Sequence, residues 1–114
     1  MRVLTCNIEA DLPTLEEARR RIAAMIRDAK RGRVRVLKVI HGYGSSGKGG
    51  TLCFGLRKSF GLRKKEGAIK DFVPGEDFSI FNEGTLQLLE QFPELRGDPD
   101  LNATNQGVTI LWLR

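Results

Sequence analysis

The chain is poor in the residues that build disulfides and metal sites. It has two cysteines, Cys6 and Cys53, and a single histidine, His41, in 114 residues. The cysteines are far apart and form no C-x-x-C pair, which predicts buried free thiols and a reducing, cytoplasmic location. One histidine and two scattered cysteines do not supply the ligand set of a zinc site, so we predict no metal-binding residues.

Long hydrophobic runs are also absent. No stretch of about 18 apolar residues occurs, which excludes a membrane-spanning helix of ordinary length. Residues 1–7 lack the apolar core of a signal peptide. We therefore expect no membrane partner. With 40% hydrophobic and 29% charged residues, the 114-residue chain is expected to form one globular domain, residues 1–114.

Acidic residues are scarce in the first part of the chain. Residues 1–70 carry 17 Lys and Arg against 6 Asp and Glu, a net charge of +11. Residues 71–114 carry 2 Lys and Arg against 8 Asp and Glu, a net charge of −6. This asymmetry indicates an anionic partner for the first part. Nucleic acid is the leading candidate, because clustered cations release counterions from a polyphosphate.

Apolar periodicity predicts an alternation of strands and helices. Thr14 and Glu17 form a capping box that begins the first helix. The fold class expected is α/β, a two-layer sandwich with a four-stranded mixed sheet, two main helices and the order β-α-β-α-β-β. The first three strands should be largely parallel and the last antiparallel. The expected strands are residues 1–8, 34–40, 68–73 and 107–113, and the expected helices are residues 15–30 and 52–62.

An acidic insertion separates the last two strands, at about residues 74–106. It contains one short helix, expected at residues 83–92, before prolines and a glycine interrupt regular structure. Two hypotheses describe the insertion. It covers the edge of the sheet or the rim of the core, or it lies near the basic helix and competes there with nucleic acid.

A glycine-rich loop, residues 41–50, follows the second predicted strand and precedes a helix. Gly42-x-x-x-x-Gly47-Lys48 fits most of a Walker A loop, but Gly49 replaces the Ser or Thr that would hold Mg²⁺. Gly42-x-Gly44-x-x-Gly47 fits the dinucleotide fingerprint, with Asp71 near the position of the acidic partner. The chain is short for a complete dinucleotide domain. Nucleotide binding is therefore a distant alternative.

The third motif in this loop is H-G-x-G, formed by His41, Gly42 and Gly44. Together with the preceding strand Val36–Ile40, the helix start Glu16-Glu17-Ala18 and the terminal Gly107-Val108-Thr109-Ile110-Leu111, it resembles the small MutS-related (Smr) domain. The resemblance implies a two-layer α/β fold and nucleic-acid binding. In some members of the family it also implies nicking of DNA or cleavage of RNA.

One departure from the family bears on catalysis. Members with nuclease activity often carry L-D-x-H or L-D-x-R in the first strand, and residues 4–11 contain no such motif. The candidate catalytic residues are then His41, as acid, base or phosphate partner, with Glu9 and Asp11 as the available carboxylates. A second hypothesis makes His41 a structural residue that is hydrogen-bonded to the loop backbone.

The predicted function is nucleic-acid binding, to DNA or RNA, with weak or degenerate endonuclease activity as an extension. Binding should need no cofactor, whereas a nuclease would use Mg²⁺. The alternative is a non-catalytic protein-interaction or regulatory domain. The oligomeric state stays open. The predicted nucleic-acid-binding residues are Gly42, Tyr43, Gly44, Lys48, Arg57, Lys58, Arg63, Lys64 and Lys65.

Overall fold

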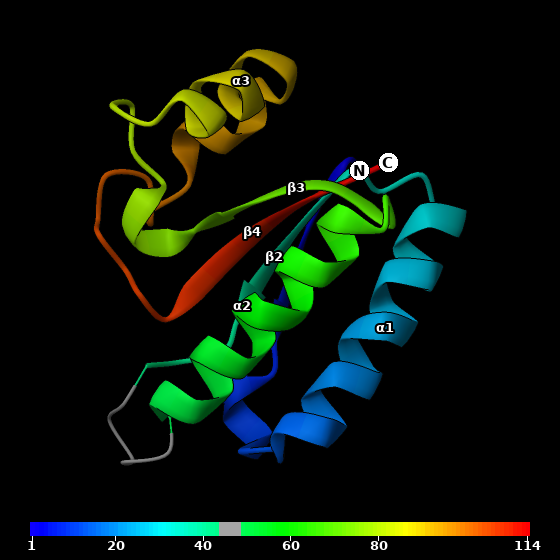
Figure 1. Cartoon of the computed structure of the whole chain (residues 1–114). Coiled ribbons are helices and arrows are strands. Elements are labelled where there is room, and N and C mark those ends of the chain that lie inside the picture. Colours follow the sequence, from blue (N-terminus) through cyan, green and yellow to red (C-terminus); the bar gives the residue numbers. More distant parts are fainter. Residues whose placement is uncertain (44–48) are drawn as a thin grey trace.

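Four strands form one mixed sheet, and two long helices cover one of its faces (Figure 1). The computed structural model describes residues 1–43 and 49–114. Three short 3-10 helices lie in the connections, at Glu9–Asp11, Gly75–Asp77 and Pro93–Gly97. The main elements are β1 (Val3–Asn7), α1 (Leu15–Arg31), β2 (Val36–Ile40), α2 (Gly49–Lys65), β3 (Ile69–Pro74), α3 (Glu83–Gln91) and β4 (Val108–Leu113).

The strand order in the sheet is β1-β2-β4-β3. β1 pairs with β2 in parallel, and β4 runs antiparallel to both β2 and β3. The first three strands therefore share one direction, as predicted. The last strand inserts between β2 and β3, which brings the start of β4 beside the end of β2, with Val108 opposite Ile40.

The face under α1 and α2 holds the first hydrophobic core. Thr14 caps α1, because its hydroxyl accepts a 3.1 Å hydrogen bond from the Glu17 amide. The apolar stripe of α1 is buried against the sheet at Ala18, Ile22, Ile26 and Ala29. Leu56 and Phe60 of α2 belong to the same core cluster. Both expected helices are present, and α2 is longer at both ends than its apolar pattern indicated.

The insertion packs on the opposite face of the sheet (Figure 1). Its buried side chains form a second core with residues of β2, β3 and β4. The structure therefore extends the first hypothesis, because this segment completes the core instead of only covering its rim. The second core comprises Val36, Val73, Phe78, Leu88, Leu89, Phe92, Leu95, Ile110 and Trp112.

A buried lysine ties the insertion to the sheet. Lys38 lies on β2 and its Nζ contacts Asp98 at 2.8 Å and Asp100 at 2.5 Å. Burial acts to lower the pKa of Lys38, but the hydrogen bonds and charges of the two carboxylates outweigh it, so the pKa is raised. The lysine stays charged, and the two aspartates fix the end of the insertion against the sheet.

The two cysteines, Cys6 and Cys53, are buried free thiols, as predicted. Burial raises the pKa of both. Over the described residues, we find no helix that is both long and apolar enough to cross a membrane.

Candidate nucleic-acid interface

The candidate site lies where β2 ends, next to the loop that leads into β4. The backbone amides of His41 and Gly42 both donate to the Gly107 carbonyl, each at 2.9 Å. Gly42 has a φ of +78°, and a Cβ there would lie 2.0 Å from the Glu9 carboxylate. The positive φ favours glycine at this position, and the two backbone hydrogen bonds fix the start of the glycine loop.

His41 is buried, with 1% of its surface exposed, and both of its ring nitrogens have partners. Nδ1 lies 2.9 Å from the Gly42 carbonyl, and Nε2 lies 2.8 Å from the Thr109 hydroxyl. A carbonyl can only accept, so Nδ1 carries the proton and Nε2 accepts from Thr109. Burial is the main cause that lowers the pKa of His41, which keeps the ring neutral at pH 7.

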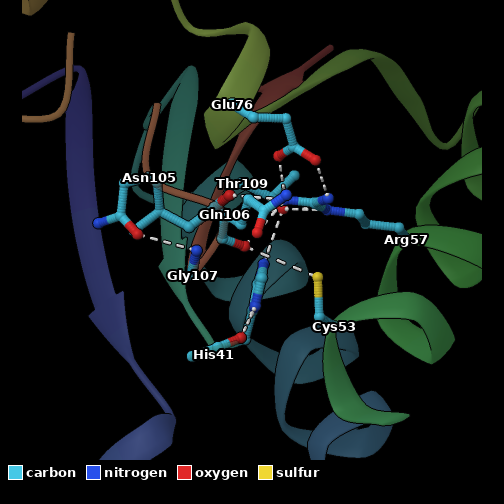
Figure 2. A network of polar contacts seen from close by, with 10 residues as sticks. His41, Cys53, Arg57, Glu76, Asn105, Gln106, Gly107 and Thr109 are labelled. Atoms are coloured by element: carbon cyan, nitrogen blue, oxygen red, sulfur yellow. Dashed lines mark hydrogen bonds and ion pairs between the residues drawn. The ribbon is translucent and has the colours of Figure 1, made fainter. Parts of the chain in front are cut away.

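Arg57 of α2 reaches across to the same strand end (Figure 2). Its guanidinium binds Glu76 through two hydrogen bonds of 2.7 Å and donates to the carbonyls of Gln106 at 3.1 Å and Val108 at 3.2 Å. Its Nε also donates to Thr109 at 3.3 Å. Arg57 therefore anchors the start of β4, which differs from the phosphate contact predicted from its charge.

Glu76 is the carboxylate that fixes Arg57. Burial alone would raise the pKa of Glu76, but the hydrogen bonds and charge of Arg57 outweigh it and hold the pKa below its usual value. This ion pair joins the acidic insertion to α2, beside the hydrogen bonds that the Gln106 carbonyl accepts from Arg57 and Cys53. Other acids of the insertion pair elsewhere: Glu94 binds Arg2, and Asp98 binds Lys38. The insertion therefore lies near the basic helix at Arg57 and Cys53, and its competition with nucleic acid there stays a prediction.

Asn105 links this network to the buried lysine. Its amide nitrogen donates to Asp100 at 2.9 Å, and its side-chain oxygen accepts from the Gly107 amide at 2.9 Å. Because Gly107 in turn holds His41 and Gly42, a continuous set of contacts runs from Lys38 to the glycine loop. The insertion thus supports the site from the second face of the sheet.

The two candidate catalytic carboxylates have different surroundings. Glu9 lies against Gly42, in a surface pocket of about 330 Å³. Asp11 forms an ion pair with Arg21 of α1. In residues 1–43 and 49–114, no group of three or more His, Cys, Asp or Glu side chains is placed to hold a metal ion. The pocket is lined by Glu9, Ile40, Gly42, Tyr43, Thr104, Asn105, Gln106 and Gly107.

The remaining predicted binding residues lie at several places. Lys58 and Lys65 are exposed on α2, and Arg63 is half-buried there. Lys64 pairs with Asp71 at 2.9 Å. Tyr43 is exposed at the edge of the pocket. Gly44 and Lys48 lie outside the described residues.

This arrangement of strands and helices is found in known proteins. The sequence model of the Smr domain matches residues 12–114. The chain belongs to the Smr domain family. The crystal structure of the Smr domain of Thermus thermophilus MutS2 is similar, with a TM-score of 0.57 and 16% sequence identity. The match covers 100% of this chain and 99% of that chain, and at this identity it shows a shared fold. The search of curated proteins found no match.

Smr domains are a family of nucleic-acid-binding and endonuclease-type domains, so the resemblance read from the sequence is confirmed at the level of family and fold. Two partners of His41 in this Smr domain, Gly107 and Thr109, belong to the terminal motif that carried the resemblance. Their contact with His41 was not predicted, because a sequence does not show which strand β4 adjoins. Glu76 and Asn105 had no recognisable sequence signal beyond their acidic or turn-rich surroundings.

Proposed function

We propose that this Smr domain binds nucleic acid through its phosphates, with low sequence specificity, along the exposed side of α2. The observation that carries the proposal is the position of Lys58 and Lys65. They are seven residues apart and both exposed, so they lie on the same side of the helix. Residues 49–65 contain no Asp or Glu to oppose them.

The end of the sheet supports the same interpretation. α2 begins at Gly49, directly after the glycine-rich segment, and the dipole of a helix favours an anion at this end. Gly42 and His41 hold the start of that loop in a fixed conformation. In this proposal His41 is a positioning residue: burial keeps its ring neutral, and the hydrogen bonds with Gly42 and Thr109 orient it.

Efficient cleavage is not part of the proposal. Both ring nitrogens of His41 are engaged inside the chain, and Asp11 is paired with Arg21. Glu9 remains the candidate carboxylate beside the loop. Nicking assays on plasmid DNA and on single-stranded RNA, with and without Mg²⁺, test this point. Cleavage that is lost in Glu9→Gln but kept in Lys58→Ala would contradict binding without cleavage.

The direct test is a titration of labelled nucleic acid at low salt. The double variant Lys58→Ala/Lys65→Ala should bind more weakly than wild type, because two phosphate contacts are removed. Arg96→Ala is the matched control, since it removes an exposed cation from the insertion on the other face of the sheet. Equal affinity of the double variant and wild type, or equal loss in Arg96→Ala, would contradict the proposal.

The protein-interaction alternative rests on a different surface. Ile80, Phe81 and Leu86 of the insertion are exposed apolar side chains, and Phe81 is 93% exposed. Clustered exposed apolar residues can mark a protein-binding site. If wild type shows no salt-sensitive nucleic-acid binding at all, this surface becomes the better candidate.

A further inference from the structure

Two exposed aromatic side chains meet beside the glycine loop. Tyr43 follows the end of β2 and is 42% exposed, and Phe54 lies in the second turn of α2 and is 60% exposed. Their ring centroids are 5.9 Å apart, with an interplanar angle of 83°. Phe60, farther along the same helix, is completely buried in the core. Phe54 and Tyr43 thus form an aromatic pair that faces solvent.

The aromatic pair adjoins the cations of the proposed interface. Lys58 lies four residues after Phe54, so the two side chains are neighbours on the surface of α2. Lys65 continues the same side of the helix, and Leu62 between them is 53% exposed. An aromatic face next to an ammonium group matches the two parts of a nucleotide, because bases stack on aromatic rings and phosphates bind cations.

We infer that the nucleic acid bound by this domain is single-stranded, with an unpaired base stacked on the Tyr43–Phe54 pair and its neighbouring phosphate on Lys58. This inference rests on the proposed function and adds the substrate class. In the interior of a duplex, neighbouring base pairs cover both faces of each base, whereas an unpaired base can present a free face to the aromatic pair.

Charge complementarity favours this ligand over an apolar protein partner. Lys58 and Lys65 are exposed cations on this side of α2, whereas Arg57 and Lys64 are paired with Glu76 and Asp71. A scattered exposed apolar side chain is ordinary on a protein surface. Here the two rings contact each other, and one of them also lines the polar pocket that contains Glu9 and Asn105. Stacking does not depend on the base, which agrees with low sequence specificity.

The test compares Phe54→Ala and Tyr43→Ala with wild type on oligothymidylate, oligouridylate and a blunt-ended DNA duplex. Each variant should lose about 5- to 150-fold in affinity for the single strands, the range for one base stacked on an aromatic ring. Affinity for the duplex should change little. Phe81→Ala is the matched control, because it removes an exposed phenylalanine from the insertion. The two single strands show whether DNA or RNA is preferred.

A second variant detects base stacking by fluorescence. Phe54→Trp places an exposed indole at the site, whereas Trp112 is buried, and unpaired bases should quench the new fluorescence. Two results overturn the inference while the proposed function stands. In the first, Phe54→Ala binds single strands as tightly as wild type does. In the second, Phe54→Ala loses as much affinity for the duplex as for the single strands. The inference is also overturned if Phe54→Ala reduces the affinity for phosphatidylserine vesicles as much as the affinity for single strands. Absence of wild-type binding to every nucleic acid overturns both.

Discussion

Replacement of Thr109 by valine isolates the network that positions the glycine loop. Thr109 is completely buried, and its hydroxyl joins His41 Nε2 at 2.8 Å to Arg57 Nε at 3.3 Å. Valine keeps the shape and the β-branch but removes the hydroxyl. His41 then has a buried ring nitrogen without a donor. Loss of one partner from a buried polar group costs about 1–3 kcal/mol.

For a domain of this length, about 1 kcal/mol corresponds to about 4 °C in melting temperature, so Thr109→Val should melt about 4–12 °C below wild type. Thermal and urea denaturation measure the difference. Thr5→Val is the matched control, because Thr5 is an exposed strand residue whose change should cost less than about 0.5 kcal/mol. A Thr109→Val variant as stable as this control would refute the role assigned to the network.

Three further changes test other parts of the structure. Lys38→Met should cost about 3 kcal/mol in urea denaturation, because it leaves two partly buried carboxylates without their cation, and changing both aspartates to asparagine should restore part of the loss. Because the folded-state pKa of His41 is lowered, wild type should lose stability as pH falls below about 6.5, whereas His41→Gln should show less of this decline. Gly75→Ala should destabilise by about 2 kcal/mol, because its Cβ would lie 1.9 Å from the Asn105 carbonyl oxygen, whereas Gly61→Ala should stabilise by about 0.5–1 kcal/mol.

Each of these three has a clear contradicting result. The account of the buried lysine fails if Lys38→Met unfolds at the same urea concentration as wild type. A pH profile of His41→Gln parallel to that of wild type would show that the buried ring does not govern the decline. Equal effects of the two alanine substitutions would mean that the close backbone approach at Gly75 is not limiting.

Local patterns predicted the fold well. The stripe from Ala18 to Ala29 and the Thr14 cap determine α1 through contacts within a few residues, and such contacts are visible in a sequence. The alternation of strands and helices predicted three parallel strands, and the last strand, which follows no crossover helix of this kind, was predicted to be antiparallel. Both directions are confirmed. The role of the insertion was harder to predict, because its contribution to a second core depends on which face of the sheet Leu88 and Phe78 contact.

The candidate site was predicted only in part. The glycine loop and His41 follow from a local motif, but the partners of His41 come from β4 and α2, far away in the chain. Net charge predicted that both Arg57 and Lys58 bind phosphate. The two residues are adjacent in the sequence, but on α2 they point to different surroundings. Arg57 turns toward the start of β4, whereas Lys58 faces solvent with Phe54.

The salt dependence of binding tests the central claim most directly. We would measure the affinity for oligothymidylate over a range of salt concentrations for wild type and for Lys58→Ala/Lys65→Ala. If both lysines contact phosphate, the log–log slope of the double variant should be shallower by about 1.4, since each contact to a single strand contributes about 0.7. The Arg96→Ala control should keep the wild-type slope. Equal slopes for the double variant and wild type would contradict phosphate binding along α2.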